Sequence, residues 1–132
     1  MIYNGFQDIA HVARTYYKDN NCCTVVSLAV CASVGYGKAF HVFKRLGRIT
    51  GTGTRFPMQV AAFKELGLTL QPIEHRGIRT INQAENYLRG ITGNYLVYST
   101  GHVSAVSDGV MHDWASGGSR KRVRGIYKIV AV

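Results

Sequence analysis

The clearest structural signal in this chain lies at residues 101–114, which read GHVSAVSDGVMHDW. Two runs rich in apolar and β-branched residues flank the dipeptide Asp108-Gly109. Asp-Gly between such runs is typical of a tight two-residue turn, because both residues tolerate positive φ. The sequence therefore predicts a β-hairpin in which Ser107 pairs with Val110.

This register sorts the polar residues of the hairpin between its two faces. Side chains alternate along a strand, so His102, Ser104 and Asp113 are expected on one face. His102 and Asp113 become diagonal cross-strand neighbours, with the small Ser104 leaving the space between them open. His112 falls on the opposite face and Asp108 lies in the turn, so neither is expected to act with His102.

The remaining elements divide the chain into an earlier part rich in helices and a later part rich in strands. The apolar periodicity and the glycine stops predict helices at 24–34, 38–46, 57–67 and 81–88, with a short helix possible in the first twenty residues. Further strands are predicted at 68–72, 94–99 and 123–132. Helices before an antiparallel sheet indicate an α+β fold. Because 24–34 is apolar nearly all round, it should be the central, buried helix.

Length and composition indicate one domain spanning residues 1–132. The chain is 46% apolar, and no apolar run approaches the roughly 18 residues of a membrane span. Residues 1–5 lack the features of a secretory signal. The three cysteines are an odd number, and two of them are adjacent, which favours free thiols in a reducing cytoplasm. No Cys/His spacing resembles a zinc site, so we predict neither metal nor cofactor.

The charge balance is strongly basic, with 16 Lys and Arg against 7 Asp and Glu and a formal net charge of +9. Most of these cations lie singly or in pairs, and the one cluster is at residues 120–124. The scatter favours an ordinary basic surface. The alternative interpretation is an acidic protein partner or substrate, or nucleic acid, which is the less favoured of these.

A thiol stands where the apolar helix begins. Residues 20–29 read NNCCTVVSLA. A cysteine at a helix N-terminus faces unpaired N–H groups and the positive end of the helix dipole, which favour thiolate. The first N–H groups of such a helix can also hold an oxyanion, and the amides of Asn20 and Asn21 are candidates to assist. Both asparagines have a structural alternative as turn and helix cap.

Taken together, these segments resemble the small papain-like cysteine peptidase domains of phage and bacterial genomes. The resemblance rests on CTVVSLA at 23–29, GR at 47–48, GTGT at 51–54, GHVSAV at 101–106 and DGVMHD at 108–113. It implies a papain-like fold in which Cys23 is the nucleophile, His102 the base and Asp113 the group that orients the base. Cys22 stands where the family has Asp or Asn. The glutamine that the family places before its nucleophile is absent, so Asn20, Asn21 or backbone N–H groups would stabilise the oxyanion.

The function that these observations predict is a thiol hydrolase acting on a peptide or isopeptide bond of a protein or peptide substrate. Two alternatives remain open. The same triad serves a thioester-forming acyltransferase or deamidase, because each reaction passes through a thioester. A non-catalytic, phage-encoded basic protein that binds a host factor would also explain the charge. In either case the expected location is the cytoplasm, that of the host if the chain is phage-encoded.

Overall fold

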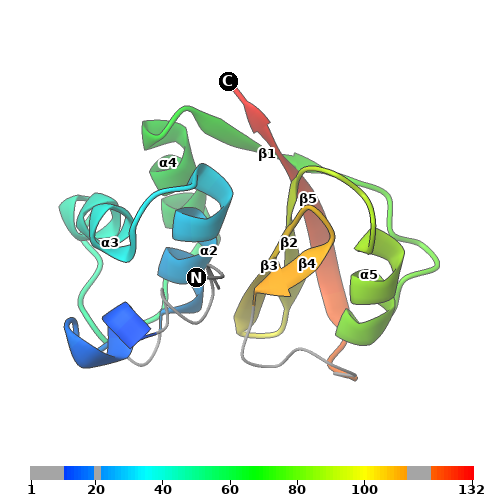
Figure 1. Ribbon diagram of the computed structural model, residues 1–132, viewed down its shortest axis with the longest axis horizontal. Coiled ribbons are helices and arrows are strands. Elements are labelled where there is room, and N and C mark those ends of the chain that lie inside the picture. The colour runs from blue at the N-terminus through cyan, green and yellow to red at the C-terminus, as the bar shows by residue number, and fades with distance from the viewer. Residues whose placement is uncertain (1–10, 20–21, 113–119) are drawn as a thin grey trace, which may run out of the picture.

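Helices and sheet lie side by side in this molecule (Figure 1). The structure, a computed structural model, describes residues 11–19, 22–112 and 120–132. The elements are α2 (Cys23–Ala32), α3 (Tyr36–Arg45), α4 (Phe56–Glu65), β1 (Leu68–Pro72), α5 (Ile81–Leu88), β2 (Asn94–Ser99), β3 (His102–Ser107), β4 (Val110–His112) and β5 (Val123–Ala131). Residues 11–15 are also helical. The predicted α+β class is confirmed.

The sheet is five-stranded in the order β1-β5-β2-β3-β4, and every neighbouring pair is antiparallel. The predicted bounds of β1, β2 and β3 agree with the structure residue for residue. The C-terminal strand β5 lies between β1 and β2, an insertion that the sequence pattern did not predict. It brings the start of β5 beside the end of β2, where Ser99 pairs with Val123.

The β3–β4 hairpin has the predicted register. Ser107 pairs with Val110. Asp108 and Gly109 have φ values of 48° and 83°, the positive pair of a type I′ turn. The Asp108 carboxylate accepts a hydrogen bond of 2.8 Å from the Gly93 N–H, which ties the turn to the start of β2. Asp108 is therefore occupied in holding the turn, as its position in the sequence suggested.

Gly109 is the position in this turn where a side chain cannot be accommodated. A Cβ there would lie 2.5 Å from the Gly90 backbone nitrogen and 3.3 Å from the Leu88 carbonyl oxygen. Gly109→Ala is expected to lower the free energy of unfolding by roughly 2–4 kcal/mol, from left-handed strain and backbone overlap together. Urea denaturation measures the loss. Gly77→Ala is the matched control, since a Cβ there meets nothing within 4 Å; equal stability of the two variants would contradict the packing argument.

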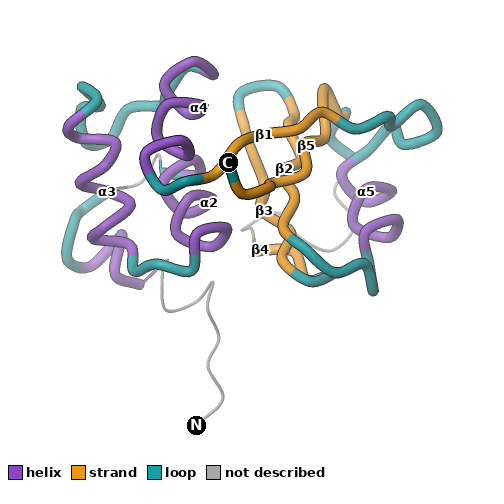
Figure 2. The backbone as a smooth tube through the Cα atoms, turned by 90° about the horizontal axis from the view of Figure 1, so that it is seen from above, coloured by secondary structure: helices purple, strands orange, loops and turns teal. Residues whose placement is uncertain are grey.

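Helix α2 is the central helix, as its apolar sequence predicts. Seven of its ten residues are buried, and it packs between the other N-terminal helices and the sheet (Figure 2). It ends two residues earlier than predicted. Ser33 adopts the left-handed conformation, with φ 54°, and a left-handed residue of this kind closes a helix. The start at Cys23 is one residue earlier than predicted.

Two cores lie on opposite faces of the sheet. Helices α2, α3 and α4 cover one face and α5 covers the other (Figure 2). The first core includes Leu28, Phe43, Phe63, Leu96 and Ala105, and the second includes Ile81, Leu88, Val97, Val106 and Ile126. Helix α5 begins with a side-chain cap: the Thr80 hydroxyl accepts a hydrogen bond from the Gln83 N–H, and the Gln83 side chain completes a capping box.

Within the described part of the chain, no single helix is long and apolar enough to cross a membrane. Helices α2 and α3 satisfy that length and composition test only when taken together, and they are bent by 119° at their junction.

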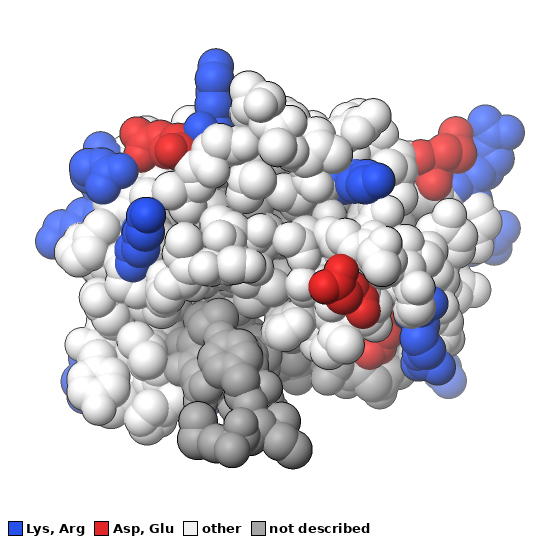
Figure 3. Space-filling view, turned by 45° about the horizontal axis from the view of Figure 1, so that its top comes forward, with Lys and Arg blue, Asp and Glu red and all other residues white. Residues whose placement is uncertain are grey.

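The basic side chains are spread over the molecule. On the face drawn in Figure 3 they stand around the periphery and are not gathered into one patch. One of them, Arg48, is not a surface residue, because it is only 7% exposed. The interpretation of the scattered cations as a basic surface is wrong for this residue.

Candidate active site

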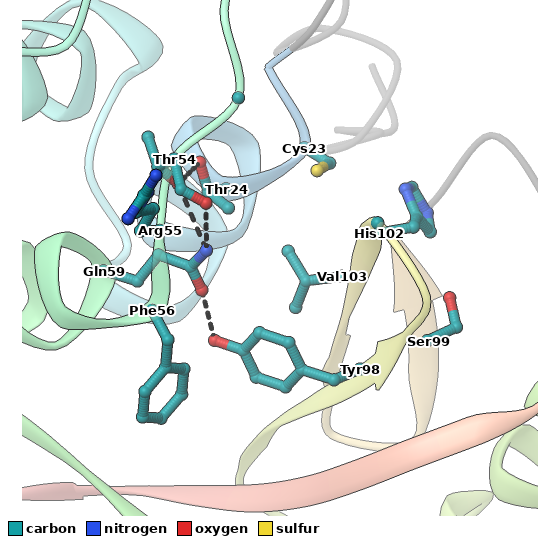
Figure 4. A pocket seen from close by; sticks show the side chains of 12 residues that line it. Cys23, Thr24, Thr54, Arg55, Phe56, Gln59, Tyr98, Ser99, His102 and Val103 are labelled. Carbon is teal, nitrogen blue, oxygen red and sulfur yellow. Dashed lines mark hydrogen bonds between the residues drawn. The ribbon is translucent and has the colours of Figure 1, made fainter.

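A pocket of about 470 Å³ opens where the start of α2 meets the β2–β3 hairpin. Three segments that are far apart in sequence form its walls: the first turn of α2, residues 53–59, and the end of β2 with the start of β3 (Figure 4). Its lining residues are Cys23, Thr24, Gly53, Thr54, Arg55, Phe56, Gln59, Tyr98, Ser99, Gly101, His102 and Val103. The loop at residues 51–56 forms a rim of the pocket and contributes four of them.

Cys23 is the first residue of α2 and is half-buried. Figure 4 shows it across a gap from the strand end that carries His102. The preceding residue, Cys22, makes no side-chain cap, and the first turn of the helix contains no acidic residue. The first N–H groups of a helix have no acceptor within the helix. Thiol, helix dipole and N–H donors therefore meet at one point, as a thiolate nucleophile requires.

The other two cysteines are buried away from this position. The Cys22 thiol donates to the Asp19 carbonyl oxygen at 3.7 Å, and burial, together with the charge of Asp19, raises the pKa of Cys22 to about 11. Burial raises the pKa of Cys31 to about 12. Both groups remain protonated near neutral pH. Cys31 is a core residue, and of the two adjacent cysteines only Cys23 lines the pocket.

His102 begins β3 and lines the pocket wall opposite Thr54 (Figure 4). It pairs across the hairpin with Ser99, whereas Val103 pairs with Tyr98. Val103 and Tyr98 face the α2 side of the sheet, and the ring of His102 is directed away from them (Figure 4). His102 thus reaches the pocket because it stands at the end of its strand. A hydrogen bond to the thiol requires its side chain to turn toward Cys23.

The other predicted site residues divide into two groups. Asn20, Asn21 and Asp113 lie outside the described residues, so their roles as oxyanion donors and as orienting group stay predictions. His112 is placed on the face opposite His102, as expected, because it pairs with Ala105. Burial lowers the pKa of His112, and its buried Nδ1 has no hydrogen-bond partner among the described residues.

A chain of hydrogen bonds joins the three walls of the pocket. The Tyr98 hydroxyl donates to the Gln59 side-chain oxygen at 2.6 Å, and the Gln59 amide nitrogen donates to both the carbonyl and the hydroxyl oxygen of Thr54 at 3.1 Å. The Thr54 hydroxyl donates to the Thr24 hydroxyl at 2.9 Å. Both amide hydrogens of Gln59 are therefore engaged. This glutamine holds the pocket together and leaves no donor for an oxyanion.

A second polar cluster, the Asp19 cluster, anchors the chain a few residues before Cys23. Asp19 is fully buried and accepts hydrogen bonds from two Arg48 nitrogens at 2.7 and 3.0 Å, from the Tyr36 hydroxyl at 2.9 Å and from the Gly51 N–H at 3.2 Å. Burial disfavours the charged guanidinium, but the hydrogen bond and the charge of Asp19 outweigh it and raise the pKa of Arg48. The cluster fixes the residue-19 turn against the loop that forms the pocket rim.

Neither cluster was predicted from the sequence. One signal was available for Gln59, which shares the buried face of α4 with Ala62 and Phe63 at helical spacing. A polar residue on such a face needs a buried partner. No comparable signal marked Asp19 or Arg48, which lie in turns. Comparisons with known protein families, characterised proteins and solved structures found no match to this chain.

Proposed function

We propose that this protein is a papain-like thiol hydrolase that cleaves a peptide or isopeptide bond. The observation that carries the proposal is the convergence of Cys23 and His102 on one pocket, although 78 positions (102 − 23 − 1) separate them in the sequence. The thiol belongs to the first turn of the central helix, and the histidine to the first residue of an antiparallel strand. This placement agrees with the resemblance found in the sequence, which supplies the papain-like part of the proposal.

The reaction assigns a task to each group. His102 takes the proton of the Cys23 thiol, and the thiolate attacks the carbonyl carbon of the scissile amide. The N–H groups at the start of α2 hold the oxyanion that forms. His102 then delivers its proton to the leaving nitrogen, the C–N bond breaks and a thioester remains. Water, losing a proton to His102, attacks the thioester and releases the acid, which restores the thiol. Asp113 would fix the ring of His102 during both proton transfers.

The first test is the reactivity of the three thiols. The native protein is treated with iodoacetamide at pH 7, and the adducts are mapped by tandem mass spectrometry. Cys23 should be alkylated at least about tenfold faster than Cys22 or Cys31, since a thiol with a pKa of about 11 or 12 holds almost no thiolate at that pH. In urea the three rates should converge. Equal labelling in the native protein would refute the proposed nucleophile.

The fate of the thioester separates hydrolysis from its chemical relatives. Incubation with candidate protein substrates, followed by intact-mass measurement, distinguishes chain cleavage from the loss of one side-chain amide or from the gain of an acyl group. Cleavage that disappears in Cys23→Ala supports the hydrolase. Mass changes without cleavage would assign the same site to deamidation or acyl transfer.

A further inference from the structure

Among the described residues that line it, the pocket that holds Cys23 contains one permanent cation, Arg55, and no carboxylate. Its twelve lining residues include Arg55 and His102, and none is Asp or Glu. The first turns of α2 and of α4, which both reach the pocket, also contain no acidic residue. A substrate that enters this space therefore meets the positive charge of Arg55, and within the described residues no carboxylate lines the same space.

Arg55 lies at one side of the pocket. It is exposed and directly precedes α4, on the wall opposite His102 (Figure 4). The same residue lines an adjoining pocket of about 410 Å³ on the other side of residues 53–55. Within the described residues Arg55 has no carboxylate partner. Its guanidinium is available to a ligand that runs from one pocket to the other.

Arg124 lies beside the turn that leads to His102, although it does not itself line the pocket. It lies near the start of β5, and its Nε donates to the Thr100 hydroxyl at 3.2 Å. Thr100 directly precedes Gly101 and His102, which line the pocket. This contact keeps the exposed Arg124 beside the turn that carries the proposed base. Arg124, too, is without a carboxylate partner in the described part of the chain.

We propose that the substrate is an acidic polypeptide segment whose carboxylates pair with Arg55 on one side of the scissile bond and with Arg124 on the other. This inference rests on the proposed thiol hydrolase. Guanidinium groups pair with carboxylates through charge-assisted, bidentate hydrogen bonds, and two cations that flank a nucleophile would position an extended chain across it. A polypeptide is favoured because the proposed hydrolase acts on a peptide bond. Arg124 belongs to the basic cluster at residues 120–124, so nucleic acid is the competing outcome of the test.

The test measures how peptides protect Cys23 from iodoacetamide at low ionic strength. The probes are a decapeptide of alternating Glu and Ala, its Gln-Ala counterpart and a ten-nucleotide oligothymidylate. The Glu peptide should halve the alkylation rate at a concentration roughly three- to tenfold lower than the Gln peptide, as expected for two exposed charge pairs. Charge reversal in Arg55→Glu/Arg124→Glu should abolish this preference. Arg89→Glu, on the far side of the sheet at the end of α5, is the matched control and should retain it.

The outcomes separate this inference from the function on which it rests. Slow labelling of Cys23 without any peptide would refute the thiol hydrolase itself. If Cys23 is labelled fast, three results would overturn the acidic substrate. The two peptides could protect equally, the Glu peptide could give no protection, or its advantage could survive the double charge reversal. Stronger protection by oligothymidylate than by the Glu peptide would overturn it in favour of nucleic acid.

Discussion

Replacing His102 with asparagine is expected to slow the alkylation of Cys23 at pH 7 by about tenfold or more. Without the imidazole the thiol returns toward its ordinary pKa of about 8.5, where only a few per cent is thiolate at neutral pH. Turnover of a substrate should fall further, by roughly 10²–10⁴, since the group that carries the proton is lost. Asparagine keeps a polar side chain at the strand end, which limits any structural effect.

The pH profile makes this expectation specific. In the native protein the alkylation rate of Cys23 should already be high near pH 6, because the proposed rotation of His102 places an imidazolium beside the sulfur, where it stabilises the thiolate. In His102→Asn the rate should instead rise about tenfold per pH unit until it levels near the ordinary thiol pKa. Stopped-flow or quenched mass-spectrometric measurements between pH 5 and 9 record both curves.

His112→Asn is the matched control for this experiment. His112 lies on the neighbouring strand, on the face of the sheet that α2 covers and opposite to that of His102, but it does not line the pocket. Its replacement should leave the pH profile of Cys23 unchanged. Two results would contradict this expectation: a native pH profile of Cys23 alkylation in His102→Asn, or a shifted profile in His112→Asn. Either would mean that His102 does not turn toward the thiol and that another group takes the proton.

The second large effect concerns stability. Arg48→Met is expected to lower the free energy of unfolding by about 3–5 kcal/mol, because it leaves the carboxylate of Asp19 buried without its charged partner. The side chains of this pair are 2% and 0% exposed, and their closest atoms are 2.7 Å apart. The Tyr36 and Gly51 donors remain but cannot replace the lost positive charge. Urea denaturation at pH 7, followed by circular dichroism, measures the change.

The chain provides a closely matched control. Arg45 and Glu65 form an ion pair of the same length, 2.7 Å, but their side chains are 63% and 37% exposed. Arg45→Met should cost at most about 1 kcal/mol, because solvent screens a surface pair. If Arg48→Met does not fold, Asp19→Asn/Arg48→Met removes both charges and should recover part of the loss. If Arg48→Met lowers the free energy of unfolding no more than Arg45→Met does, burial of the ion pair does not increase its contribution to stability.

The Asp19 cluster links stability to the site. Asp19 lies four residues before Cys23, and its partner Gly51 begins the loop that reaches the pocket rim at Gly53. The cluster therefore connects the turn that leads into the nucleophile with the opposite wall of the pocket. In the same way, the hydrogen bonds from Tyr98 through Gln59 to Thr54 and Thr24 tie that wall to the sheet and to α2.

Local signals in the sequence determined most of the elements and the choice of site residues. The Asp108-Gly109 turn set the hairpin register, and with it the assignment of His102 and His112 to different faces. Apolar periodicity located the central helix and the two adjacent thiols before it, and the family resemblance chose Cys23, which lines the pocket. These features depend on residues within a few positions of one another, so the pattern along the chain contains them.

Only the tertiary structure decided which helices cover each face of the sheet and which polar groups become buried. The sequence paired His102 with the Ser104 face, but the packing of α2 on the face of Val103 and Ala105 was needed to show that His102 reaches the pocket from the strand end. In the sequence, Arg48 and Asp19 cannot be told from ordinary turn residues, because only the folded structure shows that both are buried. Such effects arise from contacts between distant segments, and the energy of a charge depends on the solvent that those contacts remove.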